Sequence, residues 1–352
     1  ANLAAVLTSP KTDFIVQGRP IPSLDAGELL VRNHAVGRNP IDWQRQAWNF
    51  VISSFPAILG TCICQRGGGG VGPSVTIFKP GDRIIGFAHG LVSKNLDNCA
   101  FQTYTALKAN ADAAVVIPAS LTFVQGATLP TAIGTAAMSL IDGFGFSLAG
   151  WQPAPRVVPP QSSAILVWGR ASAGVGSMTV QLASMAGFVV FATASEHQHS
   201  RLQALGASEV VDYHSPALVD RLVAAAVRAG VQIEYAVDAI SLFDAISLVD
   251  TLPAVVEVLT RFPGPNFKTS HIKPWPSNLA WPDDISIQHV RGDDLWGGRE
   301  DLCTWLYGEA LPKWLAKDGI VLSPHRVVDR GVAGLQNGLN ALRRGLAVEV
   351  GG

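Results

Sequence analysis

The sequence predicts an α/β protein in which a β-rich region precedes a region of alternating strands and helices. Residues 1–120 contain short apolar segments, such as 4–7, 28–34 and 83–87, which Pro and Gly turns separate. From residue 164 to about residue 250, strand and helix patterns alternate, and this order is typical of βαβ units with a parallel sheet. With 352 residues, the chain is long enough for two domains, or for one domain that another interrupts.

The individual elements follow from local patterns. Helical patterns occupy 121–129 and 131–144 on either side of Pro130, and a Pro-rich connector follows between Gly150 and Ser162. The alternating region contains predicted strands at 164–169, 188–193, 209–213 and 233–238, and predicted helices at 175–186 and 216–229. After an irregular segment at 263–296, helices are predicted at 299–317 and 331–344.

The composition argues against several classes of protein. The chain is 48% hydrophobic with a formal net charge of −1 and has no cluster of Lys and Arg, which argues against binding to nucleic acid or to a membrane surface. No apolar run approaches the ~20 residues of a membrane-spanning helix, and no signal peptide is visible. Four cysteines do not make a disulfide framework in a chain of this length, so we expect a reducing, cytoplasmic location.

The segment from Ala164 to Ala186 has the pattern of strand, tight turn and helix that a dinucleotide-binding fingerprint requires. Small residues in the turn let the backbone approach a pyrophosphate, and the free amides of the helix N-terminus bind its charge. The spacing departs from a strict GxGxxG, and such a turn can also serve packing alone. The residues expected around the pyrophosphate are Gly169, Ser172, Ala173, Gly174, Val175 and Gly176.

The end of the next predicted strand favours NADPH over NADH. NAD-binding proteins place an Asp or Glu here, where the carboxylate holds the ribose 2′-hydroxyl. In this chain Ala194 occupies that position, Ser195 follows it, and His197 lies within a turn. A hydroxyl and a basic group suit a 2′-phosphate, which a carboxylate would repel. Two alternatives stay open: a shift of two positions would make Glu196 the ribose ligand, and Ser195 can cap the next helix.

Several motifs follow one another in a definite order and spacing along nearly the whole chain. They are AVGRNPIDW at 35–43, FPAILG at 55–60, FKPGDRIIG at 78–86, GATLP at 126–130 with Thr135, the turn at 169–176, LGA at 205–207, and Asp212-Tyr213. Together they resemble the zinc-independent branch of the medium-chain dehydrogenase/reductase superfamily. Within that branch, the chain is most similar to fungal trans-acting enoyl reductases and to ToxD-like and quinone oxidoreductases.

The resemblance implies a GroES-like β-rich domain with an inserted Rossmann domain, which is a doubly wound parallel sheet. Residues 1–130 and 291–352 would form the GroES-like substrate domain, and residues 131–290 would form the NADPH-binding domain. The family's active site lies in the cleft between the two domains. Family members occur as monomers and as homodimers, and the sequence does not decide between them.

The residues at the zinc positions of the superfamily argue against a metal. Zinc alcohol dehydrogenases have a Cys after the first conserved turn and a His-Glu pair further on. Here the turn reads Arg38-Asn39-Pro40-Ile41-Asp42, and the later segment reads Leu59-Gly60-Thr61-Cys62. Cys62-Ile63-Cys64 has the wrong spacing for a CxxC half-site, and no second half follows. We therefore expect no metal.

Without a Lewis acid, the chemistry most natural to this scaffold is conjugate reduction, in which hydride from the nicotinamide adds to an activated C=C bond or to a quinone. The resemblance places Thr135 near the nicotinamide and the substrate carbonyl, and Asn39, Asp42 and Trp43 on the substrate side. It places Tyr213 with Ser195 and His197 at the 2′-phosphate. Thr135 can also be an ordinary helix-face residue, Asp42 a turn cap, and Trp43 a wall rather than a catalyst.

The leading hypothesis is an NADPH-dependent reductase of an enoyl or enone substrate. The substrate would be a small molecule or a carrier-bound acyl chain, with a polyketide synthase as the candidate partner. A quinone oxidoreductase and a non-redox, cofactor-binding protein are the alternatives. The tract at 61–72 departs from the family, because four glycines stand where it has a valine-rich strand, and each glycine weakens a strand by about 0.5–1 kcal/mol. A loop adaptation and an error in the sequence are the two hypotheses for this tract.

Overall fold

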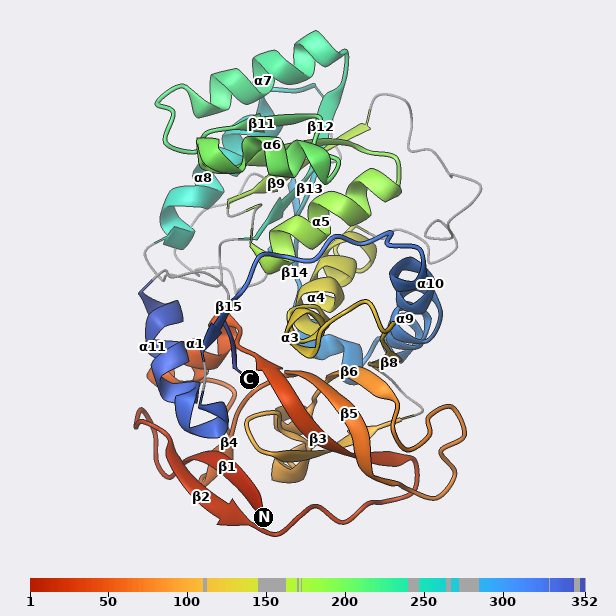
Figure 1. Ribbon diagram of the computed structural model, residues 1–352. Coiled ribbons are helices and arrows are strands. Elements are labelled where there is room, and N and C mark those ends of the chain that lie inside the picture. The colour runs from red at the N-terminus through yellow and green to blue at the C-terminus, as the bar shows by residue number, and fades with distance from the viewer. Residues whose placement is uncertain are drawn as a thin grey trace. The chain divides into compact units, whose positions relative to one another are not determined.

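The computed structural model describes residues 1–109, 113–144, 163–169, 171, 173–239, 247–263, 267–271, 285–328, 330–344 and 349–351. The chain forms two compact units, which Figure 1 shows with their elements labelled. Unit 1 comprises Ala1–Thr131 and Asp293–Gly352, and unit 2 comprises Ala132–Gly292. Unit 1 contains mainly antiparallel sheets and unit 2 a parallel sheet, so the predicted α/β class with a GroES-like part and a Rossmann part is confirmed.

Unit 1 contains two sheets. The smaller sheet has the antiparallel order β2-β1-β4, with β1 at Asn2–Leu7, β2 at Ile15–Arg19 and β4 at Ala57–Ile58. The larger sheet has the order β15-β16-β3-β5-β6-β8, and β7 also pairs with β3. Its strands are β3 Glu28–Gly37, β5 Cys62–Val71, β6 Arg83–Phe87, β7 Tyr104–Lys108, β8 Ala114–Val116, β15 Arg326–Val328 and β16 Glu349–Gly351.

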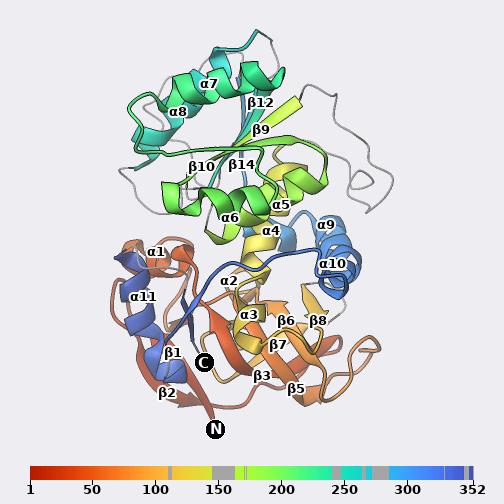
Figure 2. The ribbon, with the colours of Figure 1, turned by 45° about the horizontal axis from the view of Figure 1, so that its top comes forward.

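Short helices cover these sheets. They are α1 Pro40–Trp48, α2 Gly90–Ser93, α3 Phe123–Ala127, α9 Glu300–Trp305, α10 Leu311–Ala316 and α11 Leu335–Arg343, with the 3₁₀ turns η1 Leu96–Asn98, η4 Gly292–Trp296 and η6 Gly331–Gly334. Helices α1 and α11 pack against each other, as Figures 1 and 2 show. Leu335, Leu339 and Leu342 of α11 are buried at helical spacing and join the core of unit 1.

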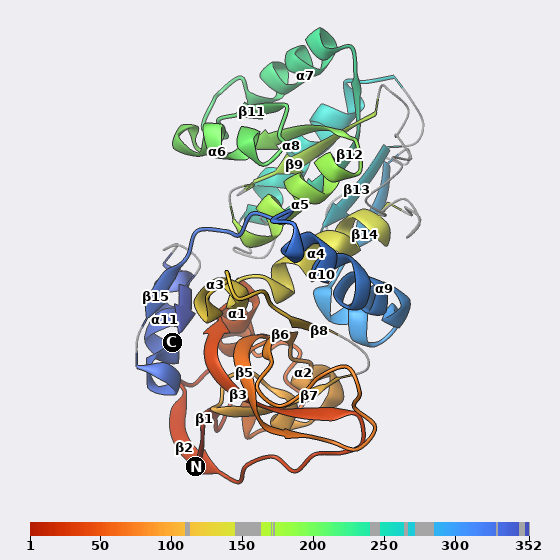
Figure 3. The ribbon, with the colours of Figure 1, turned by 45° about the vertical axis from the view of Figure 1, so that its right-hand side comes forward.

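The predicted helix at 299–317 is interrupted. A π-helical turn, η5 at Leu306–Ala310, separates α9 from α10 (Figure 3). Pro312 stands in the first turn of α10, and a proline has no N–H to continue the hydrogen-bond ladder of a preceding helix. A wider π turn before it accommodates this break.

The glycine tract forms part of strand β5, so the loop considered from the sequence is wrong. In the pairing of β5 with β3, Gly70 faces Leu30 and Gly67 faces Val31, so the register shifts between these two pairs. The long neighbour β3 supplies the backbone partners that hold the tract extended, although glycine itself favours no strand.

Unit 2 is a parallel sheet in the order β11-β10-β9-β12-β13-β14. Its strands are β9 Ser163–Trp168, β10 Val189–Thr193, β11 Glu209–Val211, β12 Gln232–Asp238, β13 Phe267–His271 and β14 Ile285–His289. Counted along the chain, this order is 3-2-1-4-5-6, which is the order of dinucleotide-binding folds. The sequence analysis expected irregular structure where β13 and β14 lie, because the short segments FKTSH and ISIQH are not apolar runs.

The helices of unit 2 cover both faces of this sheet. They are α4 Pro130–Ile141, which begins at the end of unit 1, α5 Gly174–Met185, α6 His199–Ala204, α7 Leu218–Ala229 and α8 Ser247–Thr260, with the 3₁₀ turn η3 at Glu196–Gln198. Figure 2 shows α5 and α6 on one side of the sheet and α7 and α8 on the other. In such sheets, ligands bind beyond the carboxyl ends of the strands, where the strand order reverses. Here that point lies between β9 and β12.

Candidate functional site

The turn after β9 lies at the carboxyl edge of the parallel sheet. Gly169 has a φ of +65°, a conformation that favours glycine, and its N–H donates to the Thr193 hydroxyl at 2.6 Å. Helix α5 follows, with Ala173 as its extended N-cap residue and Gly174, Val175 and Gly176 in its first turn. This turn contains no acidic residue, so no carboxylate competes with an anion there. Ser172 lies outside the described residues.

Two hydroxyl groups meet at the carboxyl ends of β10 and β11. The Ser195 hydroxyl donates to the Tyr213 hydroxyl at 3.2 Å, and Tyr213 is 43% exposed. Ala194, directly after β10, is buried, and its N–H donates to the Val211 carbonyl at 3.2 Å. Ser195 occupies the N-cap position of η3, as one alternative from the sequence had it, but its side chain makes no capping hydrogen bond. His197 is exposed on η3.

His214, which the sequence analysis did not single out, lies beside this hydroxyl pair. Its ring centroid is 4.0 Å from that of Tyr213, and its Nδ1 is 2.9 Å from Asp212 Oδ1. Hydrogen bonds from the backbone and side chain of His214 lower the pKa of Asp212. Because His214 directly follows the predicted site residue Tyr213 in the sequence, it could have been predicted to lie near the same site.

In unit 1, four polar side chains gather at the start of α1, β5 and α4; we call them the Asn39 cluster. Asn39 Nδ2 lies 3.3 Å from Thr61 Oγ1, 3.3 Å from Cys62 Sγ and 3.4 Å from Thr131 Oγ1. The two threonine hydroxyls are 2.8 Å apart, and the Cys62 thiol donates to Thr131 Oγ1 at 2.9 Å. Thr61 and Cys62 are buried, whereas Asn39 and Thr131 are half-buried. The reachable groups of the cluster are thus a carboxamide and a hydroxyl.

Asp42 lies one turn further along α1 and supports Asn39 from behind. The Asn39 N–H donates to Asp42 Oδ2 at 2.8 Å, which is the helix cap considered as an alternative from the sequence. Burial raises the pKa of Asp42 to about 6, although the Asn39 N–H and the positive charge of Arg45 act in the opposite direction. The negative charge of Asp293, which itself forms an ion pair with Arg45, raises the pKa further.

Tyr307, which the sequence analysis missed, fixes the start of α4. Its side chain is fully buried, and its hydroxyl donates to the Pro130 carbonyl at 2.7 Å. A single tyrosine within an apolar helix carries no sequence signal for such a contact. The Tyr307 contact thereby holds Thr131, the next residue after Pro130, in its place in the Asn39 cluster.

The remaining predicted residues are buried. Thr135 lies within α4, where its carbonyl accepts a hydrogen bond from the Ser139 hydroxyl at 2.9 Å. Trp43 belongs to the core of unit 1, and its ring meets that of Trp48 edge to face at 5.2 Å. The expectation that Trp43 forms a wall on the substrate side stays a prediction.

Within the part of the chain that the structure describes, no group of three or more His, Cys, Asp and Glu is arranged to hold a metal ion. None of the described helices combines the length and the apolar character needed to cross a membrane. The four cysteines are buried and have free thiols.

Comparisons with known proteins define the family. The chain is 29% identical over 361 residues to the dehydrogenase orsE of Emericella nidulans, covering 98% of this chain and 97% of the relative. It is 30% identical over 328 residues to the trans-enoyl reductase himH of Aspergillus japonicus, covering 92% of this chain and 88% of the relative. An alcohol dehydrogenase superfamily protein of Novosphingobium aromaticivorans shares the fold, with a TM-score of 0.76, 22% identity, and coverage of 100% of this chain and 99% of that one. No family model matches the chain.

The fold, the site and the relatives together define an oxidoreductase of the α/β class. The chain belongs to the medium-chain dehydrogenase/reductase superfamily, in the group of fungal dehydrogenases and trans-enoyl reductases. Membership of this superfamily implies a nicotinamide cofactor.

Proposed function

We propose that this protein is an NADPH-dependent reductase of an activated C=C bond in an enone or enoyl substrate, and that it works without a metal. The observation that carries the proposal is the Ser195–Tyr213 hydroxyl pair, with Ala194 where an NAD-binding protein has a carboxylate. The trans-enoyl reductase among the relatives supports the reaction class. Unit 2 would be the NADPH-binding domain and unit 1 the substrate domain.

The residues at the carboxyl edge of the parallel sheet fit a dinucleotide. The N-terminal amides of α5 would hold the pyrophosphate, because they point out of the helix and meet no carboxylate in its first turn. Ser195 and Tyr213 would donate hydrogen bonds to the 2′-phosphate, and His197 and His214 would contribute positive charge when protonated. The bound cofactor would supply hydride to the substrate.

The Asn39 cluster would bind the polar end of the substrate. Its half-buried members, Asn39 and Thr131, offer neutral hydrogen-bond donors, which suit a carbonyl oxygen. Asp42 would hold Asn39 in place, and the family resemblance adds Thr135 near the substrate carbonyl. Trp43, which the resemblance also places on the substrate side, would act only through the packing of α1.

The donor set of this cluster does not suit zinc. Zinc sites in this kind of fold use thiolate, imidazole or carboxylate ligands. Here Thr131 and Asn39 hydrogen-bond to the Cys62 sulfur, and burial raises the pKa of the Cys62 thiol, so the thiol stays protonated. The other groups of the cluster are a carboxamide and two hydroxyls. Reduction would therefore depend on hydrogen bonds and exclusion of water rather than on a Lewis acid.

The substrate would be a small molecule or an acyl chain on a carrier. The resemblance to trans-acting enoyl reductases makes a polyketide synthase the proposed partner. A carrier-bound chain and a free thioester share the same reacting atoms, so the enone chemistry can be tested with small molecules first.

Cofactor preference tests the proposal directly. The tryptophan fluorescence of the protein is titrated with NADPH and, separately, with NADH, for the wild type, Ser195→Asp and Ser208→Asp. Ser208 is exposed just before β11, at the opposite end of that strand from Tyr213, so Ser208→Asp is the matched charge control. We expect the wild type to bind NADPH at least tenfold more tightly than NADH. Ser195→Asp should weaken NADPH binding at least tenfold, whereas Ser208→Asp should leave it unchanged.

Turnover then separates the reaction classes. NADPH consumption is followed with 2-cyclohexen-1-one, with the crotonyl thioester of N-acetylcysteamine and with 1,4-naphthoquinone. Reduction of the enone and the thioester supports the proposal, whereas reduction of the quinone alone makes the protein a quinone oxidoreductase. Binding of NADPH without consumption of any of the three would contradict a redox function.

A further inference from the structure

His89 is a buried histidine without a hydrogen-bonding partner in the described part of the chain. It follows β6, precedes α2 and is 5% exposed. Neither ring nitrogen has a hydrogen-bond partner among the described residues. The ring lies against Trp296 of η4, with a centroid separation of 5.0 Å. A buried imidazole without partners is unfavourable unless a ligand completes it, because water no longer satisfies its nitrogens.

The chain at His89 is linked to the start of β5, where Thr61 and Cys62 of the Asn39 cluster lie. Cys62 of β5 and Phe87 of β6 are directly opposite in an antiparallel pair, so their side chains share a face. Trp296 packs on both Phe87, at 5.8 Å, and His89. Ala88, which stands between Phe87 and His89, also contacts the backbone of the Asn39 cluster, because its N–H donates to the Thr61 carbonyl at 2.6 Å.

The backbone around His89 is fixed by a close approach behind it. An ideal Cβ built on Gly90 would lie 2.2 Å from Cys99 Sγ and 2.7 Å from the Cys99 nitrogen, so only glycine fits after His89. The Asn95 N–H also donates to the Gly90 carbonyl at 3.1 Å. Position 90 therefore cannot move without displacing Cys99.

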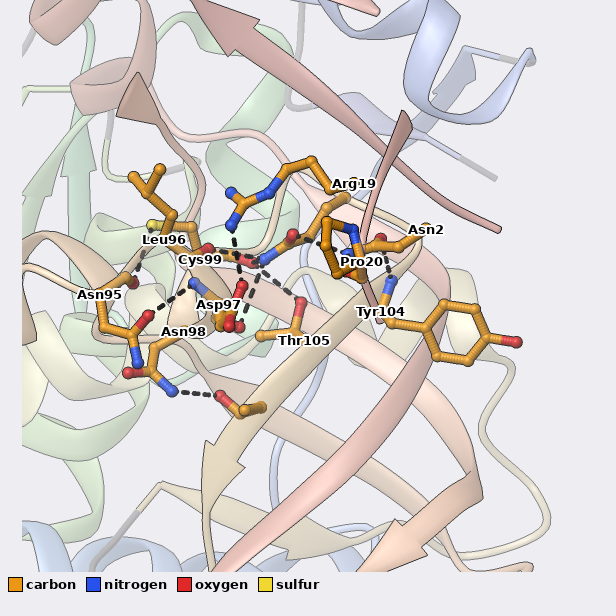
Figure 4. Close-up of polar contacts among 12 residues, drawn as sticks. Asn2, Arg19, Pro20, Asn95, Leu96, Asp97, Asn98, Cys99, Tyr104 and Thr105 are labelled. Carbon is orange, nitrogen blue, oxygen red and sulfur yellow. Dashed lines mark hydrogen bonds and ion pairs between the residues drawn. The ribbon is translucent and has the colours of Figure 1, made fainter. Parts of the chain in front are cut away.

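Cys99 is itself held by a polar network that Figure 4 shows. The Thr105 hydroxyl donates to the Cys99 carbonyl at 2.9 Å, and Asn98 Nδ2 donates to the Ala106 carbonyl at 2.8 Å. Arg19 of β2 forms an ion pair with Asp97 at 2.9 Å. The segment after His89 is thus anchored to β2 and β7, and the backbone that carries the imidazole is held in place.

We propose that His89 is a catalytic residue that donates a hydrogen bond from its ring to the carbonyl oxygen of the enone or enoyl substrate; this inference rests on the proposed function. When hydride adds to the β-carbon, the electrons of the C=C bond move into the conjugated carbonyl, and negative charge collects on its oxygen. The His89 N–H stabilises that charge beside the donors of the Asn39 cluster. Water supplies the proton that completes the reduction at the α-carbon, so His89 keeps its own proton.

A neutral imidazole suits this role. Burial, with a smaller contribution from the positive charge of Lys108, lowers the pKa of His89 to about 4. At neutral pH the ring therefore carries one N–H donor and no charge. Burying a neutral donor beside an apolar enone has a smaller desolvation penalty than burying a charged one, and the donor can still orient the developing enolate.

Three variants separate this role from packing. His89→Leu removes the donor at similar volume, His89→Gln keeps an N–H, and His34→Leu removes an exposed histidine that stacks on Phe123 at 4.7 Å in the same unit. We expect kcat/KM for 2-cyclohexen-1-one to fall about 100-fold in His89→Leu, since loss of one oxyanion donor has this effect. His89→Gln should recover at least tenfold of that loss, and His34→Leu should be unchanged.

A second readout needs neither cofactor nor turnover. The ionised form of 4-nitrophenol, 4-nitrophenolate, carries negative charge on its phenolic oxygen, as an enolate does on its oxygen, and it absorbs visible light. Titration of each variant with 4-nitrophenol gives a Kd, and we expect the phenolate to bind at least tenfold more weakly to His89→Leu than to the wild type. Equal kcat/KM values in the wild type and His89→Leu would overturn the assignment.

Enone reduction and phenolate binding test the proposed function and the role of His89 separately. If the wild type reduces no enone but the phenolate still depends on His89, the proposed function fails while the oxygen site stands. If enone reduction is normal in His89→Leu, the proposed function stands and His89 is not catalytic. A melting temperature for each variant shows whether a loss of activity or of binding reflects unfolding.

Discussion

Replacing Asp42 by asparagine should change how the stability of the protein depends on pH. Asp42 is fully buried, and its Oδ2 accepts the Asn39 N–H at 2.8 Å. Asparagine has nearly the same shape and can accept this hydrogen bond with its own oxygen. The substitution therefore removes the titrating group and leaves the cap in place, while Arg45 keeps its ion pair with Asp293.

The size of the effect follows from the raised pKa. Burial raises the pKa of Asp42 from 3.8 to about 6, so the folded protein binds this proton more tightly than the unfolded chain does. Because the folded pKa is the higher one, the contribution of Asp42 to wild-type stability is fully present below pH 4 and is lost as the pH rises through 4 to 6. At about 1.4 kcal/mol for each tenfold change in proton affinity, the full loss is about 3 kcal/mol.

Urea unfolding at pH 4 and pH 8 measures this difference. We expect the free energy of unfolding of Asp42→Asn, relative to the wild type, to increase by about 2–3 kcal/mol between the two pH values. Any pH-independent effect of the substitution cancels in this comparison. Asp82→Asn is the matched control, because Asp82 accepts the Lys79 N–H at 2.9 Å in a solvent-accessible turn, and it should show little change.

Two results would refute the reasoning. A difference between Asp42→Asn and the wild type that is the same at both pH values would mean that burial does not raise the pKa of Asp42. If Asp42→Asn instead loses stability relative to the wild type as the pH rises, Arg45 holds the Asp42 carboxylate of the wild type ionised and lowers its pKa. Either outcome would show that burial does not dominate the pKa of the Asp42 carboxyl that supports Asn39.

Two further predictions concern other contacts in unit 1. Tyr307→Phe removes the hydrogen bond to the Pro130 carbonyl, and because both groups are buried, the free energy of unfolding in urea should fall by about 1–3 kcal/mol; a fall below about 0.5 kcal/mol would show that the carbonyl finds another partner. Gly60→Ala and Gly81→Ala both place a side chain at positive φ, but a Cβ on Gly60 would lie 2.2 Å from the Phe101 ring, whereas a Cβ on Gly81 meets nothing within 4 Å. Gly81→Ala should therefore lower the stability by about 1 kcal/mol and Gly60→Ala by about 1–3 kcal/mol more, measured as melting temperatures and urea midpoints, and equal losses would contradict the clash.

The fold class was predictable because the relevant patterns are local. The apolar run before Gly169 and the helical pattern after it correspond to β9 and α5 within one residue. Strands β13 and β14 were not predictable, because their sequences FKTSH and ISIQH mix polar and apolar residues without a run. They become strands because β12 offers an open edge for parallel pairing, and this is information that only the assembled sheet contains.

The candidate site was predictable only where the family resemblance reached. Ser195 and Tyr213 are 18 positions apart and lie in contact at 3.2 Å, whereas their predicted role at the 2′-phosphate stays a prediction. The contact between Asn39 and Thr131 spans 92 positions, and the one between Tyr307 and Pro130 spans 177. Such pairs depend on the packing of several elements at once, so no local pattern encodes them. His89 escaped notice for the same reason, since its burial is a property of the folded unit.

The hydroxyl of Thr61 keeps the Asn39 cluster free of charge. An aspartate in its place would bring a carboxylate into a cluster that already adjoins the buried Asp42 beneath Asn39. Two carboxyl groups so close together repel each other when ionised, and one would be forced to stay protonated. Thr61 instead shares a hydrogen bond with Thr131 at 2.8 Å and keeps the cluster neutral. A neutral cluster leaves the Asn39 amide and the Thr131 hydroxyl available to a substrate oxygen that gains negative charge, which an aspartate at this position would oppose.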